Sequence, residues 1–354
     1  MSRYWSELVR NLTPYVPGEQ PGSRPVIKLN TNENPYPPSP AVQRAVAGVS
    51  SETLRLYPDP QSSRLKDAIA SRSGLSPEQV FVGNGSDEVL AFAFMALLKH
   101  KAPLYFPDIT YSFYPVWADL CSIGYSEVPV KADLGIDVAA IPADNGGVIL
   151  PNPNAPTGML LPLEAIAGLL QRCRDSVVVI DEAYIDFGGE SALALIEDYD
   201  NLLVVQTLSK SRSLAGLRVG VAMGNALLIE ALDRVKNSFN SYPLDTLAQH
   251  AALAAIEDED YFSATCARIV ASREQLSERL KVLGFEVLPS SANFVFARHA
   301  RRDAAELFQR LREEDILVRH FARERIQEFL RISIGTDAEC DALIDALERI
   351  LVSG

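Results

Sequence analysis

Short runs rich in aliphatic and β-branched residues alternate with stretches of helical pattern in the chain up to about residue 245. Six runs are candidate strands, at residues 80–82, 103–106, 147–150, 177–180, 202–205 and 219–223. This alternation favours an α/β fold with a largely parallel sheet, because parallel strands need a long crossover connection, usually a helix. From about residue 245 a long helical pattern extends to residue 283, and short strands and helices follow it. That change predicts a second, smaller α+β domain.

Polar or glycine-rich residues follow several of the candidate strands. They lie at residues 83–87, 107–111, 152–158, 181–184 and 207–210. In open α/β sheets, ligands bind at the carboxyl ends of the strands. We therefore expect these segments to meet around one ligand site.

The charge balance and the cysteines exclude several classes of protein. A formal net charge of −13 argues against nucleic-acid binding, which needs a cationic surface. The four cysteines lie far apart, which excludes the usual zinc patterns and disfavours a disulfide framework, so no metal site is expected. The first residues lack the apolar core of a signal peptide, and no segment has the length of a membrane span. We therefore expect a cytoplasmic protein without a nucleic-acid or membrane partner.

Lys210 lies among hydroxyl-bearing and small residues, with Thr207 and Ser209 just before it and Arg218 eight positions after it. The run suits a lysine that bonds an aldehyde cofactor bearing a phosphate. Such an amine reacts only when unprotonated, which partial withdrawal from water and nearby cationic charge favour. Hydroxyls and an arginine fork suit the phosphate. For this run alone, a surface loop with one basic residue is the alternative.

Asp181 follows the apolar run 177–180, so its side chain is expected at the end of an interior strand. A buried carboxylate there would favour the protonated form of a pyridine ring, which is the form that accepts electrons best. Tyr184, three residues on, offers a phenol for the ring hydroxyl. A strand-end aspartate that caps the next turn is the alternative.

Residues 83–88 lead directly into an apolar helix that Ser86 and Asp87 open. Free amides at a helix start attract phosphate oxygens. The segment matches neither the dinucleotide fingerprint nor the nucleoside-triphosphate loop, and a simple helix cap is the alternative. Tyr111 belongs to an aromatic cluster that either lays a ring against the pyridine or packs in the core.

Eight segments in order carry a resemblance to a known family. They are residues 10–15, 29–35, 55–59, 83–88, 152–158, 181–184, 207–218 and 329–336. Together they resemble the fold type I pyridoxal-phosphate aminotransferases, and within these the histidinol-phosphate aminotransferase family. The resemblance covers nearly the whole chain.

The resemblance implies a role for each matching residue. Lys210 would bond the aldehyde of pyridoxal 5'-phosphate and then move a proton, Asp181 would pair with the pyridine nitrogen, and Tyr184 with the ring oxygen. The residues around the phosphate would be Ser86, Asp87, Thr207, Ser209 and Arg218. The substrate pocket would contain Tyr15, Asn32, Arg319 and Arg331, with Arg331 receiving a carboxylate. Arg323 would join these arginines or be a solvated surface residue.

Two positions depart from the family pattern. Ala155 stands where an asparagine usually precedes Pro-Thr-Gly, so we expect Asn154 to bond the ring oxygen instead. The segment 107–111 differs as well, so either Tyr111 or Tyr114 would lie over the ring, with Tyr111 the first choice. Tyr57 matches a tyrosine that reaches the neighbouring subunit's phosphate site, which implies a homodimer with shared active sites.

The resemblance implies a small-domain arm at residues 1–40, a large cofactor-binding domain at 41–245 and a small α+β domain at 246–354. It also implies transamination, with glutamate as the expected amino donor and a keto compound as the acceptor. The expected reaction is histidinol-phosphate:2-oxoglutarate transamination in histidine biosynthesis. Three alternatives stay open: an aromatic or broad-specificity aminotransferase, a phosphothreonine decarboxylase, and a non-catalytic cofactor-sensing protein.

Overall fold

A computed structural model describes residues 2–22 and 25–352 of the chain. Its centre is a seven-stranded sheet with the strand order β2-β8-β7-β6-β5-β3-β4. All neighbours in it are parallel except β8, which runs antiparallel to both β2 and β7. In chain order the strands are β2 (Val80–Asn84), β3 (Leu104–Pro107), β4 (Tyr125–Val128), β5 (Gly147–Pro151), β6 (Val178–Asp181), β7 (Leu202–Thr207) and β8 (Val219–Gly224).

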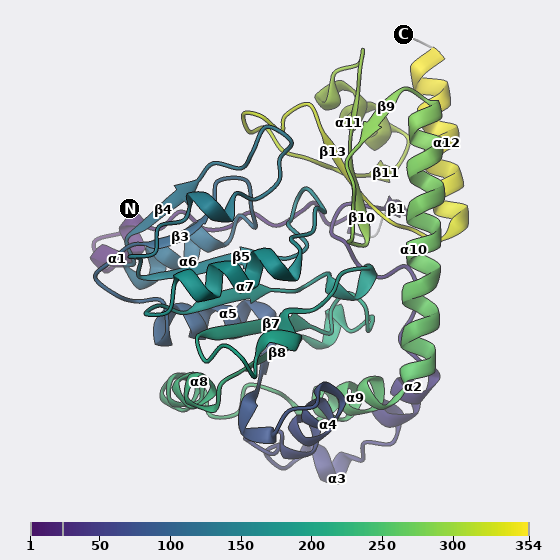
Figure 1. The fold of residues 1–354 in the computed structure, drawn as a ribbon. Helices are drawn as coiled ribbons and strands as arrows, with labels where there is room; N and C mark the ends of the chain where they lie inside the picture. The colour runs from purple at the N-terminus through teal and green to yellow at the C-terminus, as the bar shows by residue number, and fades with distance from the viewer. Residues whose placement is uncertain (1, 23–24, 353–354) are drawn as a thin grey trace.

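Helices cover both faces of this sheet (Figure 1). Successive strand residues point to opposite faces. Accordingly Ile149 packs in the cluster with α5, α6 and α8, while Val148 and Leu150 pack in the cluster with α2, α4, α7 and α9. The helices are α2 (Pro40–Ala47), α4 (Ser63–Ser73), α5 (Gly85–Ala96), α6 (Tyr114–Cys121), α7 (Leu163–Arg172), α8 (Ala226–Phe239) and α9 (Thr246–Glu257).

A smaller α+β unit follows, with the antiparallel strand order β12-β13-β10-β9. Its core contains residues of this sheet and of α10, α11 and α12. The N-terminal segment joins it, because β1 (Ile27–Lys28) pairs in parallel with β11 (Ile316–Leu317). The other elements are α10 (Glu259–Val282), β9 (Phe285–Val287), β10 (Phe294–His299), α11 (Ala304–Glu313), β12 (Arg319–His320), β13 (Leu330–Ser333) and α12 (Asp337–Val352). The expected fold class, a large mostly parallel sheet flanked by helices plus a smaller α+β unit, is confirmed.

The helical pattern predicted as one stretch at 245–283 is two helices, α9 and α10. Asp258 ends the first, and its side chain accepts a hydrogen bond from the amide of Tyr261 in the first turn of the second. Alanines of α9, Ala248 and Ala251 among them, pack in the core of the large sheet. Helix α10 then runs from the level of α2 and α9 to the small sheet (Figure 1). The domain division with a boundary at 245/246 stays a proposal.

Short elements complete the described chain. They are α1 (Glu7–Asn11), α3 (Ser51–Leu54) and the 3₁₀ turns η1 (Pro77–Gln79), η2 (Val138–Ala140), η3 (Ile185–Phe187), η4 (Ala192–Leu195) and η5 (Ala215–Leu217). None of the helices in the described residues combines the length and apolar character needed to span a membrane.

Candidate active site

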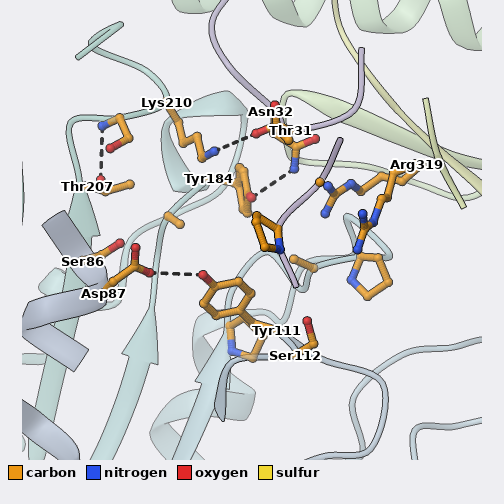
Figure 2. Close-up of a pocket in the computed structure, with 18 of the residues that line it drawn as sticks. Thr31, Asn32, Ser86, Asp87, Tyr111, Ser112, Tyr184, Thr207, Lys210 and Arg319 are labelled. Carbon is orange, nitrogen blue, oxygen red and sulfur yellow. Dashed lines mark hydrogen bonds between the residues drawn. The ribbon is translucent and has the colours of Figure 1, made fainter. Parts of the chain in front are cut away.

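A cavity of about 350 Å³ lies at the carboxyl ends of β5, β6 and β7, where the N-terminal segment and the small sheet also contribute residues. Figure 2 shows side chains from all three parts pointing into it. Thirteen of the predicted site residues line this cavity: Tyr15, Asn32, Ser86, Asp87, Tyr111, Asp181, Tyr184, Thr207, Ser209, Lys210, Arg218, Arg319 and Arg331.

Asp181 ends strand β6 with a buried carboxylate. Its Oδ2 accepts a hydrogen bond of 2.8 Å from the hydroxyl of Tyr114, a fully buried residue of α6. Among the described residues its Oδ1 has no hydrogen-bond partner. Burial raises the pKa of Asp181 to about 6, although the Tyr114 hydrogen bond acts in the opposite direction. The free oxygen is therefore suited to a cationic N–H in the cavity, since such a group would favour the ionised carboxylate.

The start of α5 and the segment after β7 form a cradle in which a guanidinium is paired with a carboxylate. Arg218 donates to Asp87 Oδ2 at 2.8 Å, and Tyr111 donates to Asp87 Oδ1 at 3.1 Å. The backbone approaches closely here, since a Cβ added to Gly220 would lie 2.3 Å from the backbone nitrogen of Ser86. Ser209 Oγ has no partner among the described residues. Helix amides, a hydroxyl and a guanidinium at one end of a cavity suit a phosphate group.

Lys210 lies in the turn between β7 and β8. Its Nζ donates to the backbone carbonyl of Thr31 at 3.1 Å and lies 5.7 Å from the centre of the Tyr184 ring. The Tyr184 hydroxyl in turn accepts a hydrogen bond of 3.0 Å from Asn32 Nδ2. Figure 2 shows these two hydrogen bonds as dashed lines. The amine, the phenol and an amide thus meet on one wall.

Two arginines form the opposite side of the cavity. Arg331 of β13 donates to the carbonyl of Asn30 at 3.0 Å, while its Nε has no partner among the described residues. Its guanidinium lies over the rings of Phe294 and Phe321, and burial lowers its pKa. Arg319 also faces this side. A buried arginine with an unused donor suits a ligand carboxylate.

Two predicted residues do not reach the cavity of their own chain. Asn154 is buried behind it, where its Nδ2 donates to the carbonyl of Ile109 and to Thr157 Oγ1. The side-chain nitrogen of Asn154 therefore donates outside the cavity, and not toward the place of the expected ring oxygen. Tyr57 is 83% exposed and stacks on Tyr242.

The two tyrosines that were candidates to lie over the ring have different positions. Tyr111 lines the cavity, whereas Tyr114 lies behind Asp181 and does not. Arg323 is outside the lining as well, with its guanidinium 3.7 Å from Glu127.

Several lining residues were missed in the sequence: Pro17, Gly18, Gln20, Thr31, Thr110 and Phe321. Thr31 and Thr110 adjoin predicted residues, and that adjacency was an available signal. Phe321 had none, because only the path of the loop after β12 brings it to the cavity.

The fold and the cavity together define a class of protein. An α/β sheet presents a lysine amine, a buried carboxylate, helix amides beside a guanidinium, and a buried arginine around one space, and this set suits a protein that handles amino compounds with an aldehyde cofactor.

Comparisons with known proteins agree with this class. The sequence profile of the family "Aminotransferase class I and II" matches residues 24–347. The chain is 62% identical to histidinol-phosphate aminotransferase 2 of Dechloromonas aromatica, covering 99% of both chains. It is 60% identical to histidinol-phosphate aminotransferase of Pseudomonas putida, covering 98% of this chain and 100% of that one. The chain therefore belongs to the class I and II aminotransferases, and within them to the histidinol-phosphate aminotransferase family.

Solved structures have the same fold. The histidinol-phosphate aminotransferase of Sinorhizobium meliloti, solved in complex with pyridoxal-5'-phosphate, matches with a TM-score of 0.90 at 27% identity and covers 100% of this chain and 99% of that one. L-threonine-O-3-phosphate decarboxylase of Porphyromonas gingivalis matches with a TM-score of 0.80 at 23% identity, over 92% of this chain and 100% of that one. The latter likeness concerns the fold alone.

Proposed function

We propose that this aminotransferase exchanges an amino group between histidinol phosphate and 2-oxoglutarate in histidine biosynthesis, with pyridoxal 5'-phosphate as cofactor. The observation that carries the chemistry is the presence of Lys210 and the unpartnered oxygen of Asp181 in one cavity. The choice of substrate is supported by the names of relatives at about 60% identity over almost the whole chain.

The cavity fits the cofactor at each end. Asp181 Oδ1 would hold the pyridine nitrogen, and the cradle of Ser86, Ser209 and Arg218 would hold the phosphate. The Tyr111 ring would cover one face of the pyridine, since aromatic rings favour offset stacking. When bound, pyridoxal phosphate supplies an electron sink that makes the α-hydrogen of an amino compound removable.

The protein's residues would supply binding, orientation and proton movement. Lys210 would bond the aldehyde carbon of the free cofactor through Nζ. Once an amino substrate has displaced it, the same Nζ would take the proton from the α-carbon of the substrate and deliver it to the former aldehyde carbon. Tyr184 would donate its hydroxyl hydrogen to the ring oxygen, with Asn32 fixing the direction of the phenol.

The substrate end of the cavity would bind two anionic groups one after the other, the carboxylate of the donor and the phosphate of histidinol phosphate. Arg331 would receive the carboxylate of the expected donor, glutamate, through its unused Nε. Arg319, Tyr15 and Asn32 would line the space for the imidazole and phosphate of histidinol phosphate. Guanidinium forks suit both carboxylate and phosphate oxygens.

We also propose a cytoplasmic homodimer in which Tyr57 completes the partner's phosphate site. Its exposure and its absence from the lining of its own chain's cavity support that arrangement.

A half-reaction assay tests the proposal. The cofactor-loaded enzyme is mixed separately with histidinol phosphate, phenylalanine, tyrosine and phosphothreonine, and the spectral change and the product are recorded. We expect kcat/KM for histidinol phosphate to exceed that for the aromatic amino acids by about 100-fold or more, as a site built for a polar group discriminates strongly. Preference for phenylalanine or tyrosine would favour the broad-specificity alternative. Release of carbon dioxide from phosphothreonine would favour the decarboxylase, and no reaction with any of them would favour a cofactor-sensing protein.

A further inference from the structure

We propose that Asn34 is a positioning residue for Lys210, acting through a strap formed by residues 30–34 that connects the lysine to Arg331. The inference rests on the proposed function, because it assigns a role in the proton transfer by Lys210.

The strap holds Lys210 at both ends of the residue. At the tip, the carbonyl of Thr31 accepts the hydrogen bond from Nζ. At the backbone, Asn34 Nδ2 donates to the carbonyl of Lys210 at 3.0 Å and to that of Ser211 at 3.2 Å. The Asn34 Oδ1 accepts from the amide of Tyr36 at 3.0 Å, which closes a local turn. The half-buried side-chain amide of Asn34 thus donates to the segment that contains Lys210 and accepts from a residue just after the strap.

The other side of the strap is attached to the small sheet. Arg331 donates to the carbonyl of Asn30 at 3.0 Å. Ser333, on the same strand, accepts from the amide of Asn32 at 2.9 Å and donates to its Oδ1 at 2.8 Å. Asn293 donates to the carbonyl of Asn32 at 2.9 Å. Five consecutive residues therefore connect the proposed carboxylate site with the proposed proton carrier.

Lys210 needs such support because of its place in the chain. It lies in the turn after β7, and the next regular element, η5, begins at Ala215. Loops hold catalytic groups less accurately than strands or helices do. A second anchor, from Ser211 Oγ to Asp186 Oδ2 at 2.5 Å, holds the neighbouring residue on the side of η3. Loss of the Asn34 donors would let the lysine backbone move, and a displacement of about 1 Å can lower a rate about 100-fold.

Single-turnover kinetics on the holoenzyme test the inference. Asn34→Asp is nearly isosteric and keeps the oxygen that closes the turn, but it lacks the two donor hydrogens. The enzyme reacts with saturating glutamate, either unlabelled or deuterated at the α-carbon. Each reaction gives a rate constant and an amplitude, and the amplitude reports the fraction of the enzyme that can react. The ratio of the two rate constants gives the isotope effect. We expect the rate constant to fall about 10- to 100-fold with a primary isotope effect at least as large as that of the wild type. The glutamate concentration at half-saturation should change less than about 3-fold.

Asn201→Ala is the matched control. Asn201 also donates to backbone carbonyls distant in sequence, those of Leu170, Cys173 and Ser176, but lies away from the cavity lining. We expect it to lower thermal stability while the rate constant stays at the wild-type value. Asn34→Ala, which also removes both donor hydrogens, replaces Asn34→Asp should that variant not fold, with a fall in the rate constant again expected.

The inference is overturned if Asn34→Asp, or Asn34→Ala in its place, retains the wild-type rate constant, with or without a loss of amplitude, because Lys210 then acts at full rate without the Asn34 donors. A wild-type enzyme that does not react with glutamate would instead overturn the proposed function. The two failures are therefore distinguishable.

Discussion

At the scale of single residues, the hydrogen bond between Tyr114 and Asp181 controls which carboxylate oxygen a ligand meets. It occupies Oδ2 and leaves Oδ1 unpartnered among the described residues. A donor to a carboxylate stabilises the ionised form. The phenol thus counteracts the burial that raises the pKa of Asp181 to about 6.

Tyr114→Phe removes that donor with little change in volume. The pKa of Asp181 should then rise further, so the carboxylate becomes protonated at a higher pH and pairs less well with a pyridine nitrogen. A lost hydrogen bond to a buried charge costs about 1.5–3 kcal/mol, so we expect cofactor affinity to fall about 10- to 100-fold near neutral pH. Titration of the apoprotein with the cofactor at several pH values checks this, and the acidic limb of the affinity profile should move to higher pH. An unchanged limb would show that Tyr114 does not act on Asp181.

Asp181 was predictable from the sequence because it stands at the end of an apolar run, where strand geometry dictates position. Lys210, which lies in the turn after β7, was predictable from the hydroxyl-bearing residues and the arginine around it. Asn154 and Tyr114 were not. Whether a loop amide faces a ligand or another carbonyl depends on the path of two loops at once, and Asn154 donates to Ile109 rather than into the cavity. Asn34 gave no signal either, since its partners lie 176 and 177 positions away.

At the scale of elements, the phosphate cradle depends on how closely β8 approaches the start of α5. Gly220 of β8 permits this contact, because a side chain there would overlap the backbone of Gly85 and Ser86. The order of β3, β5, β6 and β7 follows the expected parallel pattern. Strand β8 departs from this pattern, because it runs antiparallel to β7. The alternation of side chains along a strand is the same in both directions, so it does not predict which way the strand runs.

Gly220→Ala should push α5 away from β8. Overpacking of a close contact costs about 1–3 kcal/mol, and the displaced amides should bind phosphate more weakly. Gly168→Ala in α7 is the control, since an added Cβ there meets no atom within 4 Å, and alanine should stabilise the helix by about 0.5–1 kcal/mol. Urea unfolding and cofactor titration of both variants give the comparison. Wild-type cofactor affinity in Gly220→Ala would show that the close approach is not needed.

At the scale of the whole molecule, the cavity lies where the large sheet, the small sheet and the N-terminal segment meet, so no one of them contains the site alone. The arm pairs with the small unit through β1 and β11, and its strap reaches Lys210. The alternation of strands and helices was enough to predict the large sheet, and the change of pattern after about residue 245 predicted the smaller unit. The break between α9 and α10 was not predicted, because a helical period alone does not reveal where two successive helices divide.

The proposed homodimer predicts complementation between two inactive variants. Lys210→Ala lacks the amine, and Tyr57→Ala lacks the phenol proposed to act in the partner's site. After subunit exchange, half of the dimers should be hybrids, each with one site that has both residues, so activity should recover to about a quarter of the wild-type value. Activity measured before and after mixing gives the result. No recovery despite demonstrated exchange would mean that Tyr57 acts within its own chain, and wild-type activity of Tyr57→Ala before mixing would mean that it takes no part.

Every proposed role depends on a bond between Lys210 Nζ and the cofactor's aldehyde. Borohydride reduction of the holoenzyme, followed by proteolysis and mass spectrometry, fixes the cofactor on the residue that holds it. We expect the added mass on the peptide that contains Lys210, and its loss in Lys210→Ala. The mass on another lysine, with Lys210 unmodified, would contradict the account.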